Sequence, residues 1–170
     1  MCIRDSLPAS SGSPSRCSII TGRYPHNTGA PELHSVLPDG QLRFTELLRE
    51  AGYHCVLSGK NHMFRDDDRA FDHVSKGRGP GKEGDWEDLV RGRPEGQPFL
   101  FWFASTDAHR DWDFSDEART YRAEEVVVPP YMVDSPKTRE DLAAYYHEVS
   151  RWDHFIGRVV GALEETGALE

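Results

Sequence analysis

Residues Phe99-Leu100-Phe101-Trp102-Phe103-Ala104 decide the fold class of this chain. An unbroken apolar run of this length, bounded by Pro98, is typical of a strand that is buried on both faces of a parallel sheet. The run ends in Ser105-Thr106-Asp107-Ala108-His109. Because ligands in open α/β sheets bind beyond the carboxyl ends of the strands, His109 is a candidate functional residue.

A second strand is expected at residues 53–58, and it leads directly into Gly59-Lys60-Asn61-His62. Lys60 therefore has the same kind of strand-end position as His109. Residues 24–41 are predicted to be a loop because they are rich in Pro, Gly, His and Asn. Residues 65–97, with six glycines and many charges, are predicted to be a surface excursion with little regular structure.

Three helices are predicted from capping residues and apolar spacing. The first begins at Pro14 with Ser13 as its cap and stops at Gly22, and the second covers residues 44–51. The third is capped by Thr138 with Asp141 and stops at Gly167. Its apolar residues recur every three or four positions and are predicted to face the core: Leu142, Tyr145, Val149, Trp152, Ile156, Val159 and Leu163. Three helices and two strands indicate an α/β fold with an incomplete sheet.

The composition of the 170 residues excludes several classes of protein. Lys and Arg number 20 against 29 Asp and Glu, and residues 86–170 hold 18 acids and 9 bases, so the net charge of −9 comes from the second half. A general nucleic-acid binder should be basic instead, and no apolar run approaches the roughly 20 residues of a membrane span. Cys2, Cys17 and Cys55 are too few and too scattered for a disulfide framework or a zinc site.

The stretch Ser10-Ser11-Gly12-Ser13-Pro14-Ser15-Arg16-Cys17-Ser18-Ile19-Ile20-Thr21-Gly22-Arg23 closely resembles the signature of the sulfatase family. That signature is a Cys or Ser, one residue, Pro-Ser-Arg and, shortly afterwards, Thr-Gly-Arg. Gly59-Lys60-Asn61-His62 and Asp107-Ala108-His109 resemble later family motifs, as do Ser150-Arg151-Trp152-Asp153 and Gly157-Arg158-Val159 on the last helix. Residues 29–34 resemble the glycosaminoglycan-type sulfatases. The resemblance covers nearly all of residues 8–170.

The resemblance implies an α/β sheet of the alkaline-phosphatase-like superfamily, sandwiched by helices, and hydrolysis of sulfate esters or sulfamates, on sulfated glycans among others. In that family the Cys or Ser of the signature is converted to formylglycine by a formylglycine-generating enzyme, and Ca²⁺ binds the sulfate oxygens. By the same resemblance, Arg16 would steady the nucleophile, Lys60 would contact the sulfate group, and His62 and His109 would bind sulfate or protonate the leaving group. Such proteins are exported, periplasmic or lysosomal.

One departure from the signature concerns the nucleophile itself. Position 12, where Cys or Ser is expected, is Gly12, and glycine has no side chain to oxidise. The neighbouring Ser11, Ser13 and Cys17 are out of register with the motif. We therefore expect this chain to be inactive as written.

Both ends of the chain are interpreted as truncated. Residues 1–6 match a translated transposon end of a sequencing library and are interpreted as a non-native leader. The other end, residues 167–170, stops where an α/β chain would begin its next strand. Residues 7–170 are therefore expected to be part of a sulfatase catalytic domain that is truncated at both ends, with the family's metal ligands outside the fragment.

Several residues also have plain structural interpretations. His26 and His34 are equally consistent with surface or substrate-side roles. Asp66-Asp67-Asp68 is read as a solvated loop, and His147, Asp153 and His154 as packing or surface residues.

Two rival functions stay open. One is a phosphoester or phosphonate-ester hydrolase of the same superfamily, because the same cradle suits tetrahedral phosphorus. The other is a non-catalytic binder of sulfated glycans, which Gly12 favours.

Overall fold

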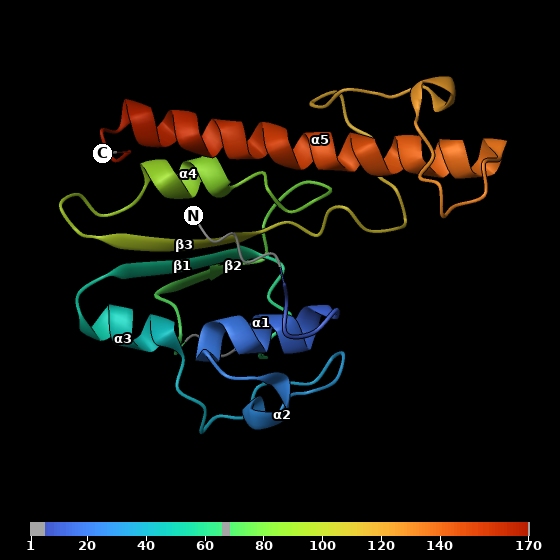
Figure 1. Ribbon diagram of the computed structural model, residues 1–170. Coiled ribbons are helices and arrows are strands. Elements are labelled where there is room, and N and C mark those ends of the chain that lie inside the picture. The colour runs from blue at the N-terminus through green and yellow to red at the C-terminus, as the bar shows by residue number, and fades with distance from the viewer. Residues whose placement is uncertain (1–5, 66–68, 170) are drawn as a thin grey trace. The chain divides into compact units, whose positions relative to one another are not determined.

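The computed structural model describes residues 6–65 and 69–169 (Figure 1). Residues 1–5 of the expected leader and the Asp66-Asp67-Asp68 run lie outside the described residues. The chain divides into two compact units. The first holds residues up to Leu57 together with Asn61–Ser75 and Pro94–Trp102, and the second holds Ser58–Lys60, Lys76–Arg93 and the chain from Phe103 onward.

The sheet has three strands in the order β2-β1-β3, where β1 is His54–Gly59, β2 is His73–Ser75 and β3 is Phe99–Ala104. The backbone N–H of His54 donates to the Pro98 carbonyl at 2.8 Å, and that of Lys60 donates to Ala104 at 2.7 Å. Both pairs advance in the same direction, so β1 and β3 are parallel. The predicted α/β class and the bounds of β3 are confirmed.

Burial along the strands differs from the prediction. In β3 only Ala104 is buried and the five large residues before it are half-buried, whereas in β1 the four residues Cys55 to Ser58 are fully buried. The expectation that β3 is buried on both faces is therefore wrong. The reason is its place at the end of the strand order, while β1 lies between two neighbours.

The helices of the first unit are α1 (Gly12–Thr21), α2 (Pro25–Thr28) and α3 (Phe44–Glu50). Helix α1 begins two residues before the predicted start, with Ser11 rather than Ser13 at the N-cap. It stops as predicted at Gly22, whose φ of +67° suits glycine. The short helix α2 lies in a stretch that was predicted to be a loop. It can begin at Pro25 because the proline ring fixes φ near the value of a first helical turn.

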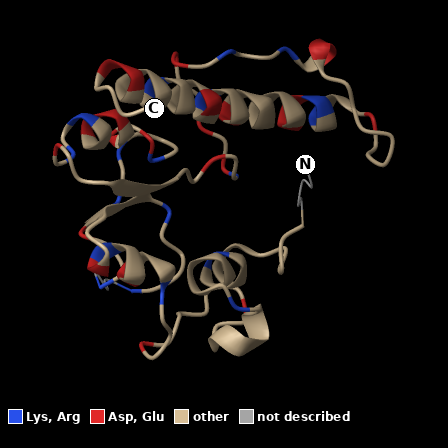
Figure 2. Ribbon diagram, turned by 60° about the vertical axis from the view of Figure 1, so that its left-hand side comes forward, with Lys and Arg blue, Asp and Glu red and all other residues tan. Residues whose placement is uncertain are grey.

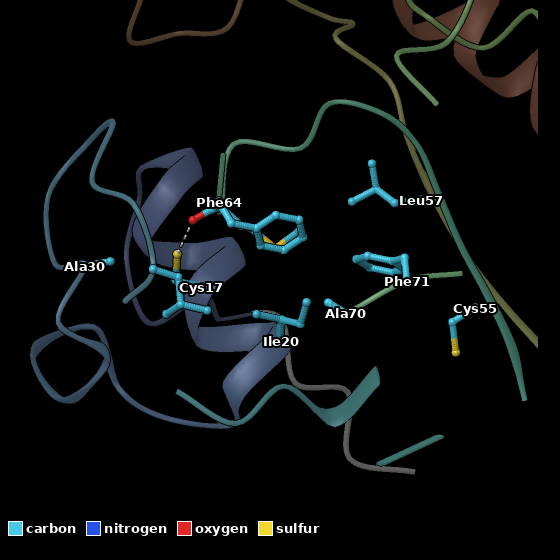
Figure 3. Packing of buried hydrophobic residues seen from close by; sticks show 10 residues of the cluster. Cys17, Ile20, Ala30, Cys55, Leu57, Phe64, Ala70 and Phe71 are labelled. Carbon is cyan, nitrogen blue, oxygen red and sulfur yellow. Dashed lines mark hydrogen bonds between the residues drawn. The ribbon is translucent and has the colours of Figure 1, made fainter. Parts of the chain in front are cut away.

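The core of the first unit is a single apolar cluster (Figure 3). The Cys17 thiol is fully buried there and donates to the Met63 carbonyl at 3.9 Å. Burial raises the pKa of this thiol, so Cys17 is a packing residue. The cluster consists of Cys17, Ile20, Ala30, Leu37, Cys55, Leu57, Met63, Phe64, Ala70 and Phe71.

The second unit contains α4 (Trp86–Arg91), the 3-10 turn η1 (Ala123–Glu125) and the long helix α5 (Pro136–Glu165). Helix α4 packs along α5 (Figure 1), and Arg91 on α4 bonds Glu165 at 2.5 Å. Strand β2 and α4, of three and six residues, are short elements within residues 65–97, where little regular structure was predicted. The stretch does not lie wholly on the surface, because Phe71 and Trp86 are buried. Ser135, not Thr138, caps α5, and its hydroxyl accepts from the Thr138 N–H at 3.2 Å. Among the described residues, no helix is both long and apolar enough to cross a bilayer.

Helix α5 buries a different face from the one predicted. Of the seven predicted core residues, Leu142, Val159 and Leu163 are half-buried and the other four are exposed. Tyr145, Val149, Trp152 and Ile156 are each between 37% and 43% exposed. The buried residues are Ala143, Ala144, His147, Glu148, Arg151, Phe155 and Ala162. The prediction that the aromatic stripe forms core is wrong, because the polar members of the buried face find hydrogen-bond partners in the loop after β3.

Candidate active-site residues

Gly12 is the first residue of α1. The formylglycine implied by the resemblance does not fit this position, because glycine has no side-chain carbon to carry an aldehyde. Arg16 follows one turn later and is half-buried, and burial lowers the pKa of its guanidinium. Gly12 and Arg16 both belong to the first unit.

His62 pairs with His34 in the same unit. The His34 Nδ1 and His62 Nε2 atoms lie 2.9 Å apart, so one ring donates and the other accepts, and the bridge holds one proton. Both residues have positive φ, +64° and +57°, which is uncommon outside glycine and typical of functional sites. The backbone N–H of His34 also donates to the Ser13 hydroxyl on α1 at 2.9 Å. The structure therefore links His62, through His34, to the residue next to Gly12.

Lys60 and His109 line one pocket of about 290 Å³ in the second unit. The pocket lies where the ends of β1 and β3 are joined by the Lys60 to Ala104 hydrogen bond. Only glycine fits just before Lys60, because a Cβ on Gly59 would lie 2.1 Å from the Ala104 oxygen and its φ is +92°. The other residues of the lining are Pro80, Thr106, Asp107, Arg110, Asp113 and Glu148.

The tautomer of His109 follows from its contacts. Its Nδ1 is in hydrogen-bond contact with the Arg110 carbonyl oxygen. A carbonyl can only accept, so Nδ1 carries the proton and Nε2 of the neutral ring is an acceptor. Protonation would make Nε2 a donor, which is what a leaving group or a bound anion requires.

Two buried residues of α5 hold the loop that carries His109. Glu148 accepts at its two carboxylate oxygens from the backbone N–H groups of His109 and Asp113, each at 2.9 Å. Arg151, fully buried one turn later, donates to Asp107 at 2.8 Å and to the Asp113 carbonyl at 3.0 Å. Both ends of the segment 107–113 are thus anchored to one helix.

Asp107 of the pocket lining lies close to a second acid, the buried Glu83. The Ser105 hydroxyl donates to Glu83 at 2.8 Å and accepts from the Asp107 N–H at 2.8 Å. Burial, with a further contribution from the negative charge of Glu83, raises the pKa of Asp107 to about 6 despite its bond to Arg151. Asp107 therefore changes charge near neutral pH.

The structure thus brings Lys60 together with His109, and His62 together with His34. Sequence reasoning missed Glu148, and it placed Arg151 and Asp107 in family motifs without the roles they have here. It interpreted His147 as a packing or surface residue, and the structure buries it. His147 accepts from the Ser115 N–H at 3.1 Å. The available signal was the three-residue spacing of Glu148 and Arg151, which places both on one face of the helix.

Calcium does not fit the described residues. Within residues 6–65 and 69–169, no three His, Cys, Asp or Glu side chains are grouped so as to hold a metal ion. The described residues therefore offer no site for calcium, and Gly12 cannot become formylglycine.

Comparison with known proteins identifies relatives but no family model matches. The chain is 26% identical over 209 residues to an ulvan-active sulfatase of Formosa agariphila, a match that covers 92% of this chain and 33% of that protein. It is also 26% identical to the N-sulphoglucosamine sulphohydrolase of Homo sapiens, covering 94% of this chain and 39% of the relative. The chain matches part of a sulfatase. It spans about a third of the length of these two sulfatases.

A third sulfatase, the N-acetylglucosamine-6-O-sulfatase of Bacteroides thetaiotaomicron, is 28% identical over 125 residues, or 58% of this chain and 22% of the relative. Solved structures confirm the alkaline-phosphatase-like α/β fold. BT33494S-sulf, from work on glycosaminoglycan metabolism by Bacteroides thetaiotaomicron, has a TM-score of 0.72 at 15% identity and covers 95% of this chain and 47% of that one. Ps i-CgsB in complex with k-i-k-neocarrahexaose has a TM-score of 0.66 at 17% identity, covering 95% and 46%.

Proposed function

We propose that the whole protein hydrolyses a sulfate ester or sulfamate on a sugar, and that this chain binds the sulfate group without turning it over. The sulfatase names of the three curated relatives support the reaction class. The observation that carries the binding is the pocket that Lys60 and His109 share. Calcium, the formylglycine-generating enzyme and an exported location belong to the proposal for the whole protein and rest on the motif resemblance.

Lys60, His109 and Arg110 are the groups of the lining that can bind a tetrahedral anion. The lining also holds three acids: Asp107 accepts from Arg151, Glu148 accepts from two backbone N–H groups, and Asp113 is exposed. Lys60 provides a compact positive charge with three donors, and Nε2 of His109 becomes a fourth when the ring is protonated. Gly12 offers no nucleophile, so Lys60 and His109 can bind and polarise a sulfate group, but this chain cannot form a covalent intermediate. The sulfate-side roles of Arg16 and His62, both in the first unit, rest on the motif resemblance.

Titration of the chain with inorganic sulfate, followed by the NMR signals of the loop 105–113, tests the binding role. Lys60→Met keeps most of the stem and removes the charge, and we expect it to weaken sulfate binding about tenfold. The matched control is Lys76→Met, because Lys76 is exposed and lies outside the pocket lining. Equal affinity in the two variants would remove Lys60 from the site, and a clear preference for inorganic phosphate would favour the phosphoester hydrolase.

The second test concerns the non-catalytic binder, which Gly12 specifically favours. Gly12→Cys, produced together with a formylglycine-generating enzyme, should carry an aldehyde at position 12, because Pro14, Ser15 and Arg16 of the signature are intact. Peptide mass spectrometry detects the change, and the native Cys17 is an internal control that should stay a thiol. An introduced cysteine that remains unmodified in Gly12→Cys would count against the catalytic parent and leave the binder as the better function.

A further inference from the structure

The paired rings of His34 and His62 bring two nitrogen atoms together within the first unit. His34 Nδ1 and His62 Nε2 lie 2.9 Å apart, and the ring centroids are 5.0 Å apart with 49° between the ring planes. The two residues are 28 positions apart in the sequence, so only the fold places them side by side. Neutral imidazole is the commonest metal ligand in proteins, which makes the pair a candidate metal site with two protein ligands.

The loops that carry the two histidines are fixed from within the unit. The backbone N–H of His34 is bonded to helix α1, and the Asn61 side chain accepts from the Met63 N–H at 3.1 Å in the turn that contains His62. The loops also join each other, because the Leu37 N–H donates to the Met63 carbonyl at 2.8 Å, and both residues belong to the buried core cluster. The two backbones are therefore held in place before any ligand binds, which lowers the entropy cost of chelation.

The spacing of the two nitrogens selects among metal ions. Ligand nitrogens lie about 2.0–2.1 Å from a bound transition metal, so two nitrogens 2.9 Å apart subtend about 90° at the ion. Neighbouring positions of an octahedral or tetragonal ion meet at that angle, whereas a tetrahedral ion needs its ligand nitrogens about 3.3–3.4 Å apart. Imidazole suits Ni²⁺ and Cu²⁺, while Ca²⁺ and Mg²⁺ prefer oxygen ligands.

A metal ion needs a lone pair from each ring, and the bridge now holds a proton on one of the two nitrogens. The ring that donates in the bridge moves this proton to its other nitrogen when the metal binds, so a neutral pair binds the ion with no net release of protons. His34 is exposed, so its ring can turn toward the ion and water can fill the remaining positions.

We propose that His34 and His62 form a binding site for a divalent transition metal with 90° ligand geometry, Ni²⁺ or Cu²⁺. Two protein ligands are all that the site has, because residues 6–65 and 69–169 contain no group of three or more metal-ligating side chains. The inference goes beyond the proposed function, since it involves neither sulfate nor turnover. A bound ion would occupy Nε2 of His62 and so withdraw that residue from the sulfate role that the motif resemblance gives it.

The test is a calorimetric titration of the chain, produced without a histidine tag, with NiCl₂. A parallel NMR titration of the ¹⁵N-labelled chain locates the ion, because paramagnetic Ni²⁺ broadens the signals of nearby residues. We expect one tightly bound ion per chain, with the backbone N–H signals of His34 and His62 broadened first. ZnCl₂ is titrated separately and should bind more weakly, because Zn²⁺ prefers a tetrahedral arrangement.

Two variants each leave a single imidazole at the site. His34→Asn and His62→Asn should keep the backbone, because asparagine is among the residues that most readily adopt the positive φ found at both positions. Loss of one of two linked ligands should weaken Ni²⁺ binding about a hundredfold. The matched control is His26→Asn, at an exposed histidine of the same unit that is not part of the pair, and it should bind Ni²⁺ as the native chain does.

Unchanged Ni²⁺ affinity in His34→Asn or His62→Asn overturns the site, as does broadening centred on a different histidine. Equal losses in His26→Asn and in the two pair variants would show adventitious binding to exposed histidines, which also overturns it. Tighter binding of Zn²⁺ than of Ni²⁺ contradicts the 90° geometry. Sulfate is absent from all of these titrations, so their failure leaves the proposed function unaffected.

Discussion

Asp107 has a pKa well above its ordinary value. Its carboxylate lies 2.6 Å from a nitrogen of Arg151, yet burial and the nearby Glu83 keep its pKa at about 6, above the ordinary 3.8. Between about pH 3.8 and about pH 6, the Asp107 carboxyl is therefore protonated in the folded state and already ionised in the unfolded chain. Within that window the free energy of unfolding falls as pH rises, because the folded state binds more protons.

Asp107→Asn should remove this fall, since an amide does not titrate and its oxygen can still accept from Arg151. We expect the free energy of unfolding of the variant, relative to the native chain, to rise between about pH 4 and about pH 6.5. Urea unfolding at a series of pH values measures it. Asp116→Asn, at an exposed position, is the control and should show no such trend. A constant difference for Asp107→Asn across the series would contradict the assignment.

At the scale of the element, α5 shows that helical spacing does not say which face is buried. Apolar residues recur along the predicted face, but an equally regular set that contains His147, Glu148 and Arg151 is the buried one. Sequence reasoning preferred the apolar set because unpaired buried charges are costly. The sequence does not show that the loop 107–115 supplies hydrogen-bond partners to His147, Glu148 and Arg151.

Two adjacent residues of α5 test the face directly. Phe155 is 6% exposed and Ile156 is 41% exposed. Phe155→Ala should destabilise the chain by about 3–5 kcal/mol. Ile156→Ala should cost less than about 1 kcal/mol, because much of its surface is already in water. Urea unfolding of both variants is sufficient, and similar costs would restore the predicted orientation.

At the scale of the whole molecule, the sequence was informative where local chemistry dominates. The extent of β3, the stop at Gly22 and the strand-end positions of Lys60 and His109 all follow from short patterns. The helix α2, the burial of β3 and the anchoring of the His109 loop do not, because they depend on contacts between residues distant in the chain. Glu148, for example, lies 39 residues from the N–H group it accepts from at His109.

The acidic excess of the second half also has a partly internal explanation. Acidic residues recur along α5 (Figure 2), but Glu148 is buried and Asp141 is engaged by Arg110 and Trp112. Two of the acids that make this half negative therefore hold the loop 107–113 in place. A net charge says little about a site when the charges that produce it are turned inward.

The three anchors of that loop, Asp141, Glu148 and Arg151, also make α5 sensitive to length. They lie on a common face only because their spacing matches the helical repeat. Inserting one residue between 141 and 148 would rotate one anchor against the other by about 100°. A substitution between residues 141 and 148 alters one contact. An insertion or deletion there would separate the contact of Trp112 with Asp141 from that of His109 with Glu148. We therefore expect changes in length to be tolerated least in this part of the chain.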